Sequence, residues 1–258
     1  MPTSFFGWVF FLLEKYGSLF LRGTWITLLV SISGTVFGFL IGLLVAIARS
    51  LPVPARSGFL SRVGIRFLHG LLTLYIEVFR GTPMIVQAMV IYYGAAQYLK
   101  LNMNELTAAV LIISVNTGAY MAEIIRGGIM SIDVGQSEAA HSIGMTHWQT
   151  MVSIILPQAI RNIMPSIGNE FVVNIKDSSV LNVIAVSELF FMSKSAAGTY
   201  LRYFEVFFIT AIIYLILTYT VTRLLRLLEK RMDGPKQFTV FGSQSDSRAG
   251  ISFVKEGK

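Results

Sequence analysis

The chain has 258 residues, 54% of them hydrophobic, no cysteine and a formal charge of +7, and its mean hydropathy is +0.65. Without cysteine, a disulfide framework and thiol chemistry are excluded. The apolar residues form long uncharged blocks, which excludes an ordinary soluble domain. The basic residues flank these blocks instead of forming one stripe, which argues against nucleic-acid binding.

The first 18 residues are expected to form an N-terminal segment in the membrane interface. The apolar run Phe5 to Leu13 is too short to cross a bilayer, and Trp8 is typical of headgroup depth. No basic n-region or small-residue cleavage site is present, so we do not expect a cleaved signal peptide.

The first membrane span is predicted at about Leu19 to Ala48. Gly34, Gly38 and Gly42 recur there at four-residue spacing, a ridge that allows another helix to approach closely. The alternative is that these glycines are only tolerated in lipid.

A second apolar region runs from Phe67 to Leu99 and is too long for one straight span. Gly81-Thr82-Pro83 predicts a break, because the residue before a proline avoids the helical conformation. We expect an interfacial or re-entrant piece up to Phe79, followed by a span from about Pro83 to Leu99.

Three more spans are predicted downstream. They cover Leu106 to Ile125, about Asn162 to Met192 as two helical pieces around a polar break, and Phe204 to Leu225. The composition then changes to Gly, Ser, Gln and charged residues, and residues 232–258 are expected to form a disordered cytoplasmic tail.

The predicted fold class is an all-α integral membrane protein with five transmembrane helices in a domain of residues 19–231. Lys and Arg are concentrated on the side that carries the first connection, the loop of about residues 127–161 and the C-terminus. The positive-inside rule therefore places the N-terminus outside and the C-terminus in the cytoplasm of a multi-pass cell-membrane protein.

The longest polar interruption in the middle of the chain runs from Glu138 to Pro157. It predicts two short helices with a bend at Gly144, an N-cap at Thr146 for the second helix, and a break or kink at Pro157. Such a helix-turn-helix at the membrane surface would present a firm contact to a partner outside the bilayer.

The spacing EAA-x3-G-x9-I-x-LP in this loop resembles the cytoplasmic signature of permeases of bacterial ABC importers. The runs Asn116 to Met145 and Arg80 to Gln87 are similar to the polar amino-acid branch, and the resemblance covers about Thr24 to Arg231. It implies the MetI-like permease fold in the bacterial inner membrane. The implied partners are two cytoplasmic ABC ATPase subunits, a second permease copy or a similar permease, and an extracytoplasmic amino-acid-binding protein.

In permeases of this kind, the loop's helix docks in a cleft of the ATPase. The resemblance makes Glu138 the charged contact, Ala139 and Ala140 the close-packed face, and Gly144 the bend, with Pro157 closing the motif. No P-loop, HExxH, G-x-S-x-G or Cys/His cluster occurs in the sequence. We therefore expect no catalytic residue, metal site or cofactor in this chain, with ATP and Mg bound by the partner ATPase subunits.

Ionisable residues within apolar segments are the candidates for binding a substrate. Asp177 could meet the ammonium group of an amino acid, with Lys176 or free backbone N–H groups meeting its carboxylate, although both charges could instead cap helix ends. Glu170 could face the same cavity. Arg80 is a second candidate for the carboxylate, or it extends toward anionic headgroups.

Asn116 and Tyr120, with Gln87, are weaker candidates for the substrate site, because polar groups at such positions can simply bridge helices. Glu123 and Arg126 are three residues apart on one predicted helix and can pair there. They form either a structural ion pair or a gate contact.

The sequence thus predicts the permease subunit of an ATP-driven importer of polar or charged amino acids, which lacks an ATPase site of its own. The alternative is an ion-coupled secondary carrier with Glu170 or Asp177 as the coupling carboxylate. The absence of an obvious inverted repeat and the presence of the Glu138 loop argue against that alternative. A simple membrane anchor does not explain Asp177 within the span. The amino acid carried, and whether the second permease is identical, remain open.

Overall fold

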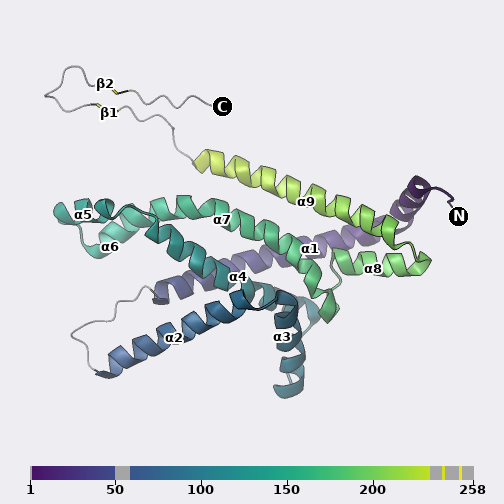
Figure 1. The fold of residues 1–258 in the computed structure, drawn as a ribbon, viewed down its shortest axis with the longest axis horizontal. Coiled ribbons are helices and arrows are strands. Elements are labelled where there is room, and N and C mark those ends of the chain that lie inside the picture. Colours follow the sequence, from purple (N-terminus) through teal and green to yellow (C-terminus); the bar gives the residue numbers. More distant parts are fainter. Residues whose placement is uncertain (1, 50–58, 233–239, 242–249, 252–258) are drawn as a thin grey trace.

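The computed structural model describes residues 2–49, 59–232, 240–241 and 250–251 of the chain. The described part is helical apart from two two-residue strands, and Figure 1 shows how the elements are arranged. The elements are α1 (Phe5–Arg49), α2 (Phe59–Gly81), α3 (Met84–Tyr98), α4 (Glu105–Met130), α5 (Val134–Ser142), α6 (His147–Thr150), the π-helix Met151–Ile155, α7 (Leu156–Asp177), the 3-10 helix Ser178–Ile184, α8 (Leu189–Tyr200), α9 (Tyr203–Met232), β1 (Val240–Phe241) and β2 (Gly250–Ile251).

Helix α1 is continuous over 45 residues, so the predicted boundary between residues 18 and 19 is not a helix end. Trp8 and Leu12 are buried against α8 and α9 instead of lying at the surface of a separate segment. The apolar groups of α8 and α9 cover this part of α1 and keep it helical. A helix of this length measures about 68 Å, more than twice the hydrocarbon core of about 30 Å.

The centre of the molecule is the packing of α1 against α4. Gly34, Gly38 and Gly42 all face α4, and a Cβ added at Gly42 would lie only 2.5 Å from the Cβ of Met121. The glycine ridge predicted from the sequence is therefore confirmed as a close helix–helix contact.

The predicted break at Gly81-Thr82-Pro83 is confirmed. Helices α2 and α3 are bent by 115° across it, and Pro83 is the N-cap of α3 with ψ of 136°, an extended conformation. Helix α2 begins at Phe59, eight residues before the apolar region predicted from Phe67, so part of the basic connection is helical.

The fourth predicted span is also bent, but at a different place. The helical path continues past Lys176 and Asp177 through the 3-10 helix Ser178–Ile184, and the chain turns at Ala185, whose φ is 63°. The following α8 is inclined by 57°. The predicted polar break at Lys176-Asp177 is therefore only a change from α-helix to 3-10 helix.

Glu188 stabilises this turn as the N-cap of α8. Its fully buried carboxylate accepts hydrogen bonds from the backbone N–H groups of Phe190 and Phe191 at 2.8 and 2.7 Å and from the Tyr214 hydroxyl at 3.1 Å. A buried carboxylate needs such donors, because an unpaired one would lose its hydration without replacement.

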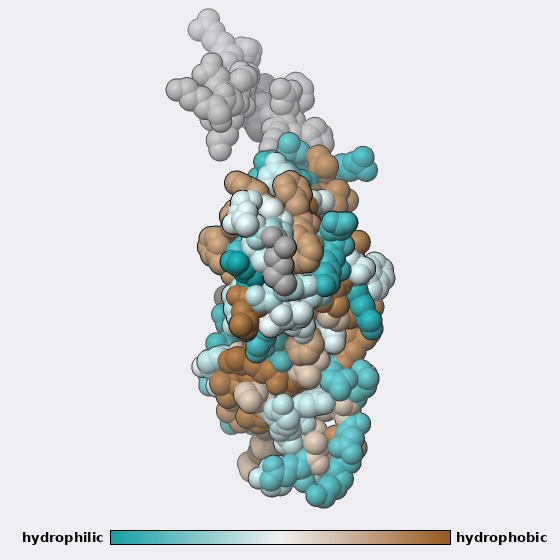
Figure 2. Space-filling model, turned by 90° about the vertical axis from the view of Figure 1, so that its right-hand side faces the viewer, coloured by the Kyte–Doolittle hydropathy of each residue, from teal (hydrophilic) through white to brown (hydrophobic). Residues whose placement is uncertain are grey.

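Within the described residues, α1, α4 and α9 are each long and apolar enough to cross a membrane, and counting each bent pair as one span gives up to five. Large hydrophobic side chains are exposed along α1 and α9, among them Phe37, Leu44 and Leu215, as expected for surfaces that face lipid. Figure 2 looks at the end of the molecule that carries α8, where hydrophilic residues lie beside hydrophobic ones.

The two ends of the molecule differ in what they carry. Helices α5 and α6, the end of α9 and the ends of α1 and α2 next to their connection lie at one end, whereas the N-terminus and α8 lie at the other (Figure 1). The predicted disordered tail, residues 232–258, lies outside the described residues except for Met232 in α9 and the antiparallel pair β1–β2.

Candidate functional site

A small polar network fixes the break between α2 and α3. The side-chain amide of Gln87 donates to the backbone oxygens of Phe79 and Thr82, both at 2.9 Å. Asn116 on α4 in turn donates to the side-chain oxygen of Gln87 at 2.8 Å. Asn116 and Gln87 therefore do bridge helices, and they satisfy backbone groups that the break leaves without helical partners.

A cavity of about 350 Å³ lies beside this break, between the start of α3, α4 and α7. It brings together four of the predicted substrate residues, Asn116, Tyr120, Glu170 and Asp177. The two carboxylates are seven residues apart, which is two helical turns, and so they share one face of α7. The complete lining is Thr82, Pro83, Met84, Asn116, Tyr120, Glu170, Val173, Asn174 and Asp177.

Arg80 lies next to this cavity without lining it. Its guanidinium carbon is 5.4 Å from the centroid of the Tyr120 ring, a cation–π distance, and its charge attracts the Glu170 carboxylate. Arg80 is therefore a cation at the edge of the cavity, near Glu170.

Lys176 is not part of this cavity. It lines a separate groove between α7 and α9, because successive residues of a helix point about 100° apart. The expectation that Lys176 and Asp177 face one substrate together is therefore not met in this structure.

Asn174 is a cavity residue that the sequence reasoning missed. Its side chain donates to Thr35 on α1 at 2.9 Å and accepts from Thr117 on α4 at 3.0 Å, so three helices meet at one buried amide. A signal was available, since a polar amide within an apolar span at bilayer depth usually faces other helices or a cavity.

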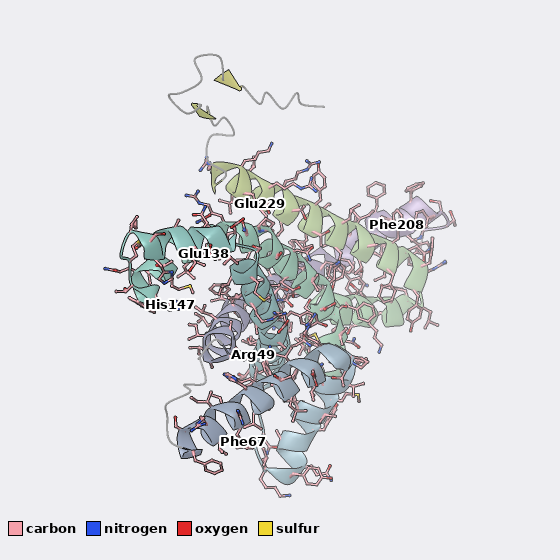
Figure 3. All side chains as sticks on the ribbon, turned by 60° about the vertical axis from the view of Figure 1, so that its left-hand side comes forward. Arg49, Phe67, Glu138, His147, Phe208 and Glu229 are labelled. Carbon is pink, nitrogen blue, oxygen red and sulfur yellow. The ribbon has the colours of Figure 1, made fainter. Side chains whose placement is uncertain are left out.

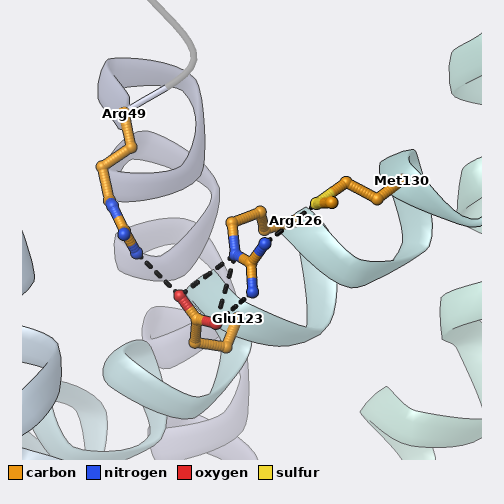
Figure 4. A network of polar contacts seen from close by, with 4 residues as sticks. All are labelled: Arg49, Glu123, Arg126 and Met130. Atoms are coloured by element: carbon orange, nitrogen blue, oxygen red, sulfur yellow. Dashed lines mark hydrogen bonds and ion pairs between the residues drawn. The ribbon is translucent and has the colours of Figure 1, made fainter.

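The predicted pair of Glu123 and Arg126 is present, with 2.8 Å between Oε2 and Nη2. A third residue, Arg49 at the end of α1, lies 2.7 Å from the other carboxylate oxygen (Figure 4). Arg126 also reaches the sulfur of Met130 at 2.9 Å. One carboxylate thus joins the ends of α1 and α4 through Arg49 and also pairs with Arg126 within α4.

The polar loop has the predicted form of two short helices with a bend. Gly144 has φ of +85°, a conformation that side chains other than glycine rarely adopt. Thr146 caps α6 in a full capping box with Gln149. Figure 3 shows Glu138 on α5 and His147 on α6 at the tip of the molecule.

The two alanines of the loop do not form one exposed face. Ala139 is exposed, but Ala140 is 2% exposed and its carbonyl accepts from Met145 N at 3.1 Å. Within this chain Ala140 closes the bend from inside, and the assignment of Ala139 and Ala140 to a close-packed face against the ATPase stays a prediction. Val134, Ile143 and Trp148 are the large exposed hydrophobic side chains of this helix-turn-helix.

Pro157 does not end or sharply break the second helix. It lies in the first turn of α7, after the π-helical turn Met151–Ile155. Proline is tolerated in a first turn because no hydrogen bond from its nitrogen is needed there. Gln158 donates its side-chain amide to the Ile154 carbonyl at 2.8 Å, one turn before it.

The comparisons with known proteins agree on one family. Residues 38–234 match the family described as the binding-protein-dependent transport system inner membrane component. The glutamine transport system permease protein GlnP of Escherichia coli (strain K12) is 37% identical over 215 residues, covering 83% of this chain and 93% of that protein. The probable amino-acid permease protein YxeN of Bacillus subtilis (strain 168) is 39% identical over 212 residues, covering 81% and 89%.

Solved structures give the same result. The crystal structure of an amino acid ABC transporter with histidines contains a chain with 38% identity and a TM-score of 0.78, covering 90% of this chain and 100% of that one. The inward-facing MetNI methionine ABC transporter shares the fold at 20% identity, with a TM-score of 0.70 over 85% of this chain and 98% of that one.

Proposed function

This chain belongs to the binding-protein-dependent transport system inner membrane component family, and from that premise we propose that it is the permease of an ABC importer for polar or charged amino acids. Its similarity to a glutamine permease and to an amino acid ABC transporter supports an amino acid as the cargo. The location is the inner membrane.

The observation that carries the substrate class is the cavity beside the α2–α3 break. Its volume of about 350 Å³ is at the small end of ligand pockets, which suits a single amino acid. Glu170 and Asp177 offer two carboxylates for ammonium groups, and Arg80 is close enough to supply a cation for the α-carboxylate. The excess of acidic groups favours substrates that carry a second cationic or amide group.

We infer that the Glu138 loop couples the pathway to two cytoplasmic ATPase subunits, which bind ATP and Mg. Glu138, Ala139 and Trp148 are exposed on its two short helices, and such a surface can transmit motion because the capping box and the bend make it rigid. A second permease copy, or a similar one, completes the pathway, and an extracytoplasmic binding protein delivers the substrate. Closure of the ATPases then reorients the helices by alternating access.

The Glu123 carboxylate and its two arginines have a gating role in this proposal. They join α1 to α4 at the end of the molecule that carries the loop, so a movement of α4 relative to α1 must exchange or break the Arg49 contact. The alternative is a permanent structural ion pair. In that case the Arg49→Gln variant would transport at the wild-type rate.

The substrate site is tested by Asp177→Asn, which keeps the size of the side chain and removes its charge. We expect substrate affinity to fall about 10- to 150-fold, because a charge-assisted hydrogen bond contributes roughly 1.5–3 kcal/mol. The measurement is ATP-driven uptake of a panel of amino acids into proteoliposomes that contain the permease, its ATPase and the binding protein.

Lys176→Gln is the matched control, because it removes a neighbouring charge that lies outside the cavity. Its apparent affinity should stay within about twofold of the wild type. Unchanged uptake by both Asp177→Asn and Glu170→Gln would show that these carboxylates are structural and that the pathway selects by shape.

The predicted orientation is tested with single cysteines, since the chain has none of its own. His147 and Asn102 are both exposed and lie on opposite predicted sides. We expect a membrane-impermeant thiol reagent to label Asn102→Cys in intact cells and His147→Cys only in inverted vesicles. Labelling of His147→Cys from outside would overturn both the orientation and the coupling role of the loop.

A further inference from the structure

A second groove with polar lining lies on a different face of α7 from the substrate cavity. It has a volume of about 420 Å³ and is formed by α7 and α9. Its lining consists of three cationic residues with hydroxyl-bearing and aliphatic neighbours, and no acidic residue is among them. The lining residues are Val172, Lys176, Leu215, Thr218, Tyr219, Thr222, Arg223 and Arg226.

The three cations of this groove have no anionic partner among its lining residues. Within residues 2–49 and 59–232, neither Lys176, Arg223 nor Arg226 takes part in an ion pair. Arg223 instead lies over the Tyr219 ring, with 4.8 Å from its guanidinium carbon to the centroid. A groove lined by cations alone raises the local concentration of anions, so its ligand is expected to be anionic.

The surroundings of the groove indicate where that anion comes from. Leu215 is 66% and Tyr219 57% exposed, so the wall formed by α9 is open on the outer side of the chain. Arg223 and Arg226 lie near the end of α9 that carries other basic residues, the kind of segment that lies next to the headgroups on the cytoplasmic side. Lys176 comes from α7, and its long aliphatic stem allows the ammonium group to reach along the groove.

We propose that this groove binds the headgroup of an anionic phospholipid. A guanidinium group can bind the oxygens of a phosphate diester in a bidentate fashion and is opposite to it in charge, and basic pockets between helices on the cytoplasmic side are typical sites for such headgroups. Thr218 and Thr222 donate their hydroxyl protons to backbone oxygens at 2.8 and 2.6 Å. Their oxygens therefore remain available as acceptors for a headgroup hydroxyl.

This site would hold α7 and α9 together from the lipid side while α7 carries Glu170 and Asp177 on its other face. The inference depends on the chain being a membrane protein and not on which substrate it carries. A failure of the lipid test therefore leaves the proposed transport function untouched.

The test is native mass spectrometry of the full chain, extracted in mild detergent and titrated with phosphatidylglycerol or with phosphatidylcholine of the same acyl chains. We expect a saturable preference for phosphatidylglycerol in the wild type. In Arg223→Gln/Arg226→Gln the affinity for phosphatidylglycerol should fall roughly 5-fold for each arginine removed. Arg223→Lys/Arg226→Lys keeps the charge and should retain most of the preference.

The matched control is Lys230→Gln/Arg231→Gln, which removes the same charge from the same helix outside the groove. It should bind phosphatidylglycerol as the wild type does. Equal loss in both double variants would mean that only general surface charge attracts the lipid, and the proposal would fail.

Two further outcomes would also overturn the proposal. If glycerol 1-phosphate, which has no acyl chains, competes as strongly as the lipid, the groove binds a soluble anion instead. If Arg223→Gln/Arg226→Gln separates permease dimers while lipid binding is unchanged, the groove is a contact between two copies of the chain. Retained size-exclusion profiles and melting midpoints confirm that each variant folds.

Discussion

Replacing Gly144 by valine is expected to abolish ATP-driven uptake while the chain still inserts in the membrane. Gly144 has φ of +85° with no neighbouring atom within 4 Å of an added Cβ, so the obstacle is the backbone conformation and not a lack of space. A β-branched residue at positive φ is a strong outlier, and the bend between α5 and α6 must therefore change. The contact surface carried by Glu138 and Trp148 would then be misaligned.

Gly144→Asn separates this explanation from its main alternative. Asparagine is several-fold enriched at positive φ, so it should keep the bend and retain most of the uptake. The alternative is that Gly144 matters because the ATPase subunit packs closely against its Cα, where no side chain would fit. In that case Gly144→Asn should lose uptake as completely as Gly144→Val. The measurements are uptake in proteoliposomes and the amount of ATPase that co-purifies with each variant, and full activity of Gly144→Val would refute the role of the bend.

The features that sequence reasoning predicted correctly depend on local backbone chemistry. The break at Gly81-Thr82-Pro83 follows from what proline does to the residue before it, and the bend at Gly144 follows from the freedom of glycine. The N-cap predicted at Thr146 is likewise a local signal, and the structure adds its capping-box partner Gln149. Each of these needs only residues a few positions apart.

The features that were missed depend on residues distant in sequence. Glu123 pairs with Arg49, which is 74 positions away, and Asn174 meets Thr35 across 139 positions. Each span was predicted from its own sequence. The sequence of one span does not indicate which face of another span packs against it. The glycine ridge was the exception, because a row of small residues predicts close contact with another helix even when that helix is unknown.

The separation of Lys176 from Asp177 shows a different kind of error. Both residues were assigned to one polar break because they are adjacent and opposite in charge, but adjacent helical residues point about 100° apart. The helix continues through Ser178–Ile184, so the two side chains stay on different faces. The two side chains are separated because the helix is continuous here. A charged pair in an apolar span does not indicate whether the helix continues or breaks.

The strongest effect on folding is expected from Gly42→Leu. An added Cβ at Gly42 would lie 2.5 Å from the Met121 Cβ and 2.8 Å from the Ala122 backbone nitrogen. Neither neighbour is the far end of a flexible side chain, so α1 and α4 would have to move apart. Overpacking of this kind typically costs about 1–3 kcal/mol, and a leucine at a backbone contact should reach or exceed the upper value.

Gly17→Leu is the matched control for this prediction, because Gly17 lies on the same helix and has nothing within 4 Å of an added Cβ. Leucine also has a higher helix propensity than glycine by roughly 0.8 kcal/mol, so this variant should melt no lower than the wild type. The measurement is the midpoint of thermal unfolding in detergent, followed by size-exclusion chromatography. An unchanged midpoint for Gly42→Leu would mean that α1 and α4 are not held at the distance seen here. The Asn174 link between α1, α4 and α7, which needs that distance, would then lose its structural basis.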